Sequence, residues 1–222
     1  MKNLVIYCAD VGSVRTGSFA WARDPAVLAE LEGVDHTSID DLCSSVADDM
    51  NHGRPVALGF ESPLFVPVPV SSADLGRARD GEGNRAWSAG AGSCVLTTGL
   101  AQTAWVLRNL REACPEQALW TTWGEFAQAG HGFIVWEAFV SEGSKPTKEF
   151  GNQHAADAKA AVDAFRAALP NPAASSAVHA TEPMSLIGAA AIWSGWAPTD
   201  PPMHKQCVVI RPGKPKDSEA IS

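Results

Sequence analysis

The segment LVIYCADVGS (residues 4–13) joins an apolar run to an acid and a turn. Its first six residues are continuously apolar and rich in strand-forming types, which indicates a strand buried on both faces. Asp10 ends the run, and the glycine and serine after it turn the chain. Residues 17–22 (GSFAWA) have the composition of a return strand. The two segments therefore predict a hairpin.

Two later apolar runs have the same form, VALGF (residues 56–60) and FIVW (residues 133–136). Helices with an apolar face are predicted at about 39–50, 97–113 and 153–169. A helical segment rich in small residues is expected at about 184–194, and further short strands near 34–37 and 206–210. Helices that alternate with strands after an opening hairpin predict an α/β fold, with a mixed central sheet flanked by helices. We expect one domain over residues 1–222, with a long loop insertion at about 62–95 and a C-terminal extension at about 170–222 that matches no pattern.

Composition narrows the classes of function. The chain has a formal net charge of −8, with 45% hydrophobic and 19% charged residues, which suits a folded core and disfavours a strongly basic nucleic-acid binder. The five cysteines form no C-x-x-C pair, so neither a zinc ribbon nor a disulfide framework is indicated. No apolar run has the length of a membrane span, and the N-terminal run is too short for a signal peptide. We expect a cytoplasmic protein without a membrane partner.

Each of the three apolar strands is followed by an acid: Asp10, Glu61 and Glu137. The carboxyl ends of parallel strands meet at one edge of a sheet, which is where open α/β sheets place their sites. Acids that meet there repel one another, and a divalent cation such as Mg²⁺ or Mn²⁺ relieves the repulsion through oxygen ligands. The alternative is that each acid only marks where its strand reaches solvent.

Helix geometry adds a fourth acid, Asp157. It shares the apolar stripe of its helix with residues at offsets of four, seven, eight and eleven: Ala161, Ala164, Phe165 and Ala168. A carboxylate on a buried stripe is unfavourable unless it is paired or bound to metal. Asp163 instead lies on the same face as Lys159 and Arg166, as expected for a solvated helix face. The alternative for Asp157 is a first-turn partner of the helix dipole without a chemical role.

Four motifs, in this order, resemble those of the RNase H-like superfamily. ADVGSVRTG (residues 9–17) looks like the first-strand motif of the RuvC and YqgF branches, and FESPL (residues 60–64) is similar to the second motif. The span 60–137 looks most like the DUF429 group of nucleases. HAADA (residues 154–158) resembles the last RuvC-like motif. Two features depart from these patterns: Glu61 stands where DUF429 proteins more often have Asp, and Glu137 is an extra acid.

The resemblance implies an RNase H-like fold and a metal-dependent nuclease, a hydrolase of phosphodiesters that uses two ions roughly 4 Å apart. Asp10 would bridge both ions, Glu61 would hold one and position the attacking water, Asp157 would hold the other, and Glu137 would be an auxiliary ligand or base. His154 would be an auxiliary proton shuttle, and Glu182 would replace Asp157 if another helix carried the last acid. Contacts to the substrate are expected from seven residues: Ser13, Thr16, Arg77, Arg79, Arg85, Lys145 and Lys148. The implied partner is DNA or RNA, and self-association as a homodimer stays open.

Two other functions compete with the nuclease. The loop after Asp10 also resembles the first phosphate loop of actin-like ATPases, which bind ATP between two such domains, and this chain is too short to supply both. A non-catalytic RNase H-like module that binds a partner without cleaving it is favoured by the acidic charge of the chain.

Overall fold

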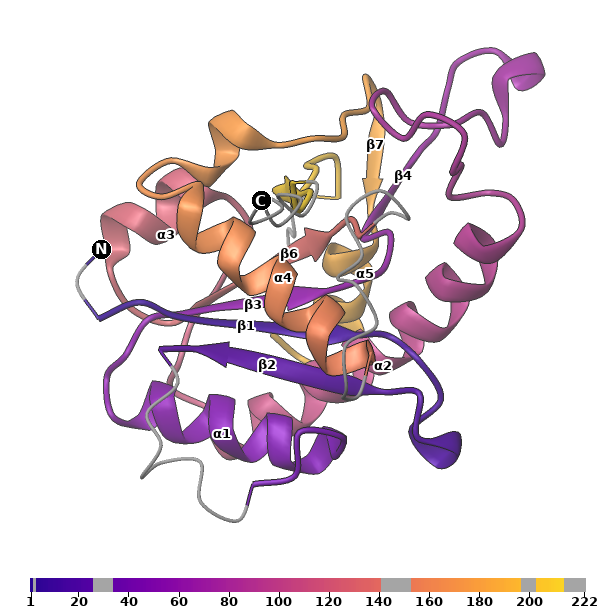
Figure 1. The fold of residues 1–222 in the computed structure, drawn as a ribbon. Coiled ribbons are helices and arrows are strands. Elements are labelled where there is room, and N and C mark those ends of the chain that lie inside the picture. Colours follow the sequence, from indigo (N-terminus) through magenta and orange to yellow (C-terminus); the bar gives the residue numbers. More distant parts are fainter. Residues whose placement is uncertain (2, 26–33, 141–152, 197–202, 214–222) are drawn as a thin grey trace, which may run out of the picture.

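The computed structural model describes residues 1, 3–25, 34–140, 153–196 and 203–213. Its centre is a mixed sheet in the order β2-β1-β3-β6-β5 (Figure 1). The strands β1 (Val5–Asp10), β3 (Val56–Phe60) and β6 (Phe133–Ala138) are parallel, and β2 (Ala20–Asp24) is antiparallel to β1. The predicted hairpin and the three buried strands are therefore confirmed.

Two short strands pair with the outer edge of β6, one at each end. The strand β5 (Leu119–Trp120) pairs with the start of β6, and β8 (Val209–Ile210) pairs with its last two residues. Both pairings are parallel. The C-terminal part of the chain thus completes the sheet at the carboxyl end of β6.

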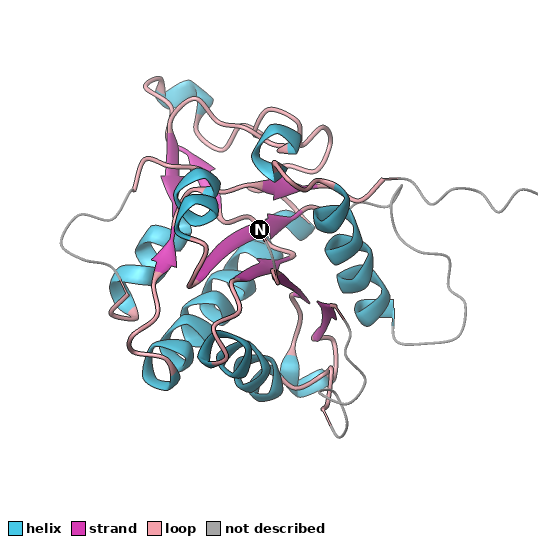
Figure 2. Ribbon diagram, turned by 90° about the vertical axis from the view of Figure 1, so that its left-hand side faces the viewer, coloured by secondary structure: helices cyan, strands magenta, loops and turns pink. Residues whose placement is uncertain are grey.

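Helices cover both faces of the sheet, as Figure 2 shows. One core lies between the sheet and α1 (Ile39–Asn51), α2 (Ala91–Ala113) and α5 (Leu186–Trp193). The other core lies between the opposite face and the helices α3 (Trp123–Ala129) and α4 (Gln153–Ala167). The predicted α/β architecture, a mixed sheet flanked by helices, is thereby confirmed.

Side-chain alternation along the three parallel strands decides which face each residue occupies. Ala9 pairs with Phe60, and Phe60 pairs with Glu137, so these three side chains point to the face covered by α1, α2 and α5. Asp10 and Glu61 are each one position further along, and they point to the face covered by α4. Glu137 therefore lies on the opposite face of the sheet from the other two strand-end acids.

The helix α2 begins at Ala91, six residues before the predicted start. Its first two turns are exposed or half-buried and carry no apolar stripe, so periodicity detects only the later turns, where Val106, Leu107 and Leu110 are buried. Gly90 precedes the helix with φ 53°, a conformation that favours glycine.

The region 62–90 is more ordered than the loop that the sequence predicts. It contains β4 (Phe65–Pro67), which pairs with β7 (Pro183–Ser185) as a separate two-stranded ribbon, and the short 3-10 helix η3 (Ser72–Asp74). Residues 34–37 form a turn rather than a strand, although the Trp21 amide donates to the His36 carbonyl oxygen at 2.9 Å.

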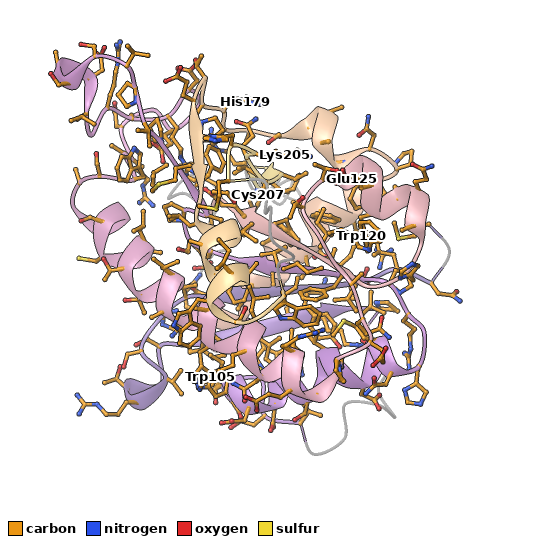
Figure 3. The ribbon with its side chains drawn as sticks, turned by 180° about the vertical axis from the view of Figure 1, so that it is seen from behind. Trp105, Trp120, Glu125, His179, Lys205 and Cys207 are labelled. Carbon is orange, nitrogen blue, oxygen red and sulfur yellow. The ribbon has the colours of Figure 1, made fainter. Side chains whose placement is uncertain are left out.

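The C-terminal segment 203–213 carries β8, and its residues 207–210 are buried. Figure 3 shows Lys205 beside Glu125 of α3, and their charged groups are 3.7 Å apart. Cys207, two residues further on, is buried. In the part of the chain that the structure describes, no helix combines the length and apolarity that crossing a membrane requires.

Candidate metal centre

Asp10 is the last residue of β1 and is largely buried, with 8% of its surface exposed. Its position follows from the pairing of β1 with β2 on one side and β3 on the other. Two strands that hold the backbone on both sides fix the position from which the carboxylate extends. The turn that follows is also held, because the Gln102 amide of α2 donates to the Gly12 carbonyl oxygen at 2.6 Å.

Glu61 continues the parallel ladder one residue beyond β3. Its amide donates to the Ala9 carbonyl oxygen at 2.8 Å, which places it next to Asp10 on the neighbouring strand. Two residues before Glu61, Gly59 lies against the ring of Trp136, and a Cβ atom at Gly59 would be only 2.4 Å from that ring. The Trp136 ring in turn contacts Phe165 of α4, with ring centroids 4.6 Å apart. The floor beneath Glu61 is thus closely packed.

Asp157 lies on the buried face of α4, with 1% of its surface exposed. The same face packs Ala161 and Phe165 against the sheet, as the helical spacing predicts. Gln153, one turn earlier, donates its amide to Asp157 Oδ1 at 2.9 Å. Asp163 is exposed and pairs with Lys159, so the contrast between the two aspartates is confirmed.

The structure brings Asp10, Glu61 and Asp157 together, and we call these three residues the acidic cluster. One oxygen atom from each carboxylate lies within 4.8 Å of the others. His154 joins the edge of the cluster, since its Nδ1 atom is 2.6 Å from Asp10 Oδ2. Among the described residues, this is the group of acids, histidines and cysteines whose geometry could hold a metal ion.

The carboxylates of the acidic cluster carry like charges and repel one another when ionised. Burial raises the pKa of the Asp10 carboxyl above its ordinary value, the contact with His154 opposes this rise, and the charge of Asp157 adds to it. Burial likewise raises the pKa of the thiol of Cys8, and the nearby Glu61 and Asp10 charges raise it further. A site that disfavours its own ionised form in this way is stabilised by a bound cation.

The structure does not place Glu137 in the acidic cluster, which corrects its predicted role as an auxiliary ligand. Its two oxygens accept from the guanidinium of Arg79 at 2.6 and 2.8 Å, and one also accepts from the Leu64 amide at 3.0 Å. The reason is the register of β6, which turns Glu137 to the other face of the sheet. Its carboxylate is therefore already neutralised within the protein.

Arg79 is likewise not available to contact a substrate phosphate, contrary to prediction. Its side chain is completely buried and also binds Glu82, with Nε 2.9 Å from Oε1. The guanidinium stacks on the Phe65 ring at 4.5 Å. We call Arg79, Glu82 and Glu137 the Arg79 cluster, which fastens the 78–87 segment to the end of β6.

Glu182 does not replace Asp157. It is exposed, immediately precedes β7 and lines a separate hollow of about 410 Å³ together with Arg77 and His179. The structure therefore places Asp157 of α4, and not Glu182, beside Asp10 and Glu61.

The other residues predicted to contact substrate do not form one group. Ser13 and Thr16 are exposed at the 3-10 helix η1 (Val14–Thr16), where the Ser13 hydroxyl accepts from the Thr16 amide at 3.3 Å. Arg77 is exposed and pairs with Asp74 at 3.3 Å. Arg85 is exposed at the cleft described next. Lys145 and Lys148 lie outside the described residues.

A cleft of about 350 Å³ opens beside the acidic cluster. Glu61 forms part of its wall, and the other walls are the 82–92 segment, which includes the start of α2, and the end of β6 with the residues after it. The early turns of α2, which periodicity does not reveal, border this cleft. Sequence reasoning also missed Gln153, although its spacing of four residues from Asp157 is a usable signal.

Comparison with protein-family models, with curated proteins and with solved structures finds no match to this chain.

Proposed function

We propose that this protein is a divalent-metal-dependent phosphodiester hydrolase, a nuclease of RNase H-like type. The observation that carries the proposal is the acidic cluster, in which Asp10, Glu61 and Asp157 come from two strands and a helix and present oxygens within 4.8 Å of one another. The order of these acids along the chain is that of the motifs that the sequence resembles. The RNase H-like assignment of the fold is part of this proposal.

The donor set fits Mg²⁺ or Mn²⁺. Three carboxylates offer hard oxygen ligands, and in a partly buried site a divalent cation offsets their mutual repulsion. Such a cation, when bound, supplies Lewis-acid stabilisation of a phosphoryl oxygen and lowers the pKa of a bound water. Asp10, Glu61 and Asp157 would be the residues that hold it.

The protein's own residues then have separate tasks. Asp10 is fixed between two strands and would provide the central ligand, while Glu61 faces the cleft and would orient the attacking water. His154, in contact with Asp10, is placed to accept or return a proton at its ring nitrogen. Gln153 orients the Asp157 carboxylate by its hydrogen bond.

The test is a titration of the protein with MgCl₂ and MnCl₂ by calorimetry, followed by cleavage assays on single-stranded, duplex and branched DNA and RNA. We expect wild-type protein to bind metal and cleave, and Asp157→Asn to lose both. Asp163→Asn is the matched control, because it makes the same change on the exposed face of the same helix.

Two results would count against the proposal in different ways. Equal metal binding by wild type and Asp157→Asn would exclude the acidic cluster as the metal site. Metal binding without cleavage of any nucleic acid would instead favour the non-catalytic binding module.

A further inference from the structure

The cleft beside the acidic cluster is placed to hold the part of a substrate next to its reacting group. Glu61 belongs both to the acidic cluster and to the cleft wall. A molecule that occupies the cleft therefore extends directly from the proposed metal site. The volume of about 350 Å³ is near the lower end of small-molecule sites, roughly 300 to 1,000 Å³.

The cleft has an aromatic and apolar lining. Trp87, Val95, Phe139 and Val140 all contribute to it. Trp87 is held in place from two sides: its indole nitrogen donates to the Arg77 carbonyl oxygen at 2.9 Å, and its amide donates to a Glu82 carboxylate oxygen at 3.3 Å. A fixed indole in a small apolar cleft suits a flat, uncharged ring.

Positive charge lies at the rim of the same cleft. Arg85 is exposed and lines it. Arg211 is not part of the lining, but it stacks on the lining residue Phe139 at 4.5 Å and donates to the Gly81 carbonyl oxygen at 2.6 Å. The first turn of α2, which also lines the cleft, contains no acidic residue, so the positive end of the helix dipole is not offset there. Glu82 and Glu137 also line the cleft, but both are paired with the buried Arg79. An anionic group is thus favoured at the rim on the side of Arg85, next to a flat ring in the interior.

A flat ring that carries an adjoining anion describes a nucleotide. We propose that the cleft binds one unpaired nucleotide of a single-stranded nucleic acid, with the base against Trp87 and a flanking phosphate near Arg85. The base of a paired nucleotide is stacked and enclosed in the duplex, so it enters a cleft of this size only after it leaves the stack. The inference rests on the proposed function in one respect only, which is that the phosphate between the bound nucleotide and its neighbour would lie at the acidic cluster.

The experiment measures binding of a short fluorescein-labelled oligothymidylate, and of the corresponding labelled duplex, by fluorescence anisotropy in EDTA. Without divalent metal the measurement does not depend on cleavage. We expect the single strand to bind more tightly than the duplex. We expect Trp87→Leu, which keeps an apolar side chain but removes the aromatic face, to weaken single-strand binding roughly tenfold.

Two variants separate base stacking from a structural role of Trp87. Trp87→Phe keeps an aromatic face, so it should retain most of the affinity, and Trp193→Leu, at an exposed tryptophan of α5, should leave binding unchanged. Arg85→Ala should lower the affinity and reduce the slope of log affinity against log salt concentration by about one.

The inference would be overturned by tighter binding of the duplex, or by equal binding of Trp87→Leu and Trp193→Leu. Single-strand binding that depends on Trp87 in EDTA, without cleavage when Mg²⁺ or Mn²⁺ is added, would support the nucleotide cleft and contradict the hydrolase. Cleavage of duplex alone, with no effect of Trp87→Leu, would support the hydrolase and contradict the cleft.

Discussion

The acidic cluster and the Arg79 cluster lie at the same edge of one sheet, on opposite faces. They differ in how the charge of their carboxylates is balanced. In the Arg79 cluster, Glu137 and Glu82 share one buried guanidinium, and the two Glu137 oxygens lie 2.6 and 2.8 Å from its nitrogen atoms. In the acidic cluster, three carboxylates converge within 4.8 Å, and burial raises the pKa of Asp10.

The difference shows that proximity of acids does not by itself define a metal site. An arginine within the fold makes one group of acids structural, whereas acids that converge on one another suit an external cation.

The largest effect is expected on catalysis. Glu61→Gln should lower the cleavage rate by about a thousandfold or more, because a catalytic metal supplies several kcal/mol of transition-state stabilisation. Glu137→Gln should retain metal affinity, since Glu137 faces the other side of the sheet. Single-turnover rates and metal calorimetry measure the two effects, and loss of metal binding in Glu137→Gln would remove the distinction between the clusters.

The next effect is on stability. Arg79→Met should lower the free energy of unfolding by about 3–5 kcal/mol, because it leaves Glu137 and Glu82 buried without their shared cation. Arg77→Met, at an exposed arginine two residues away, is the control and should change little. Urea denaturation in the absence of metal measures both. An unchanged stability of Arg79→Met would show that the 78–87 segment is not fastened by this ion pair.

A smaller effect is expected from the packing beneath the acidic cluster. Gly59→Ala should destabilise the fold by about 1–3 kcal/mol, because the added Cβ meets the Trp136 ring at 2.4 Å. Gly124→Ala in α3 has open space around its Cβ and should be neutral or slightly stabilising. Thermal denaturation measures the difference. If the two variants melt alike, the floor of the cluster is less rigid than the contact implies.

The smallest effect concerns pH. The pKa of Asp10 is raised in the folded state, so the unfolded state loses this proton first as pH increases. The contribution of Asp10 to stability therefore declines as pH rises through its unfolded and then its folded pKa. In EDTA, the stability of Asp10→Asn relative to that of wild type should be higher at about pH 7 than at about pH 4, which is near the pKa of an unperturbed Asp. A difference that shrinks with rising pH would contradict the direction of the shift.

Asp10, Glu61 and Asp157 could be predicted from the sequence because two patterns carried the information. Apolar runs ended at the first two, and helical spacing placed the third on a buried stripe. The position of Glu137 could not be predicted in this way. Val5, Val56 and Phe133 are aligned in the sheet, but the apolar run from Phe133 has four residues where the other two have five. The acid after it therefore comes one position early and points to the other face.

The Arg79 cluster and the cleft depend on contacts between segments that are distant in the sequence, and no local sequence pattern predicts such contacts. Arg79 reaches Glu137 across 58 positions of the chain. The early turns of α2 face the cleft rather than the core, so they lack the apolar stripe by which a helix is recognised.

The short strand β8 has a consequence for how the protein is made. It covers the edge of β6 at Glu137, a member of the Arg79 cluster, and at Ala138. During synthesis the N-terminal residues emerge first, so all of the acidic cluster leaves the ribosome before Val209 and Ile210 do. Until then the end of β6 exposes unpaired backbone groups that another chain could join. Once β8 has left the ribosome and paired with β6, this edge of the sheet is covered and a site of aggregation is removed.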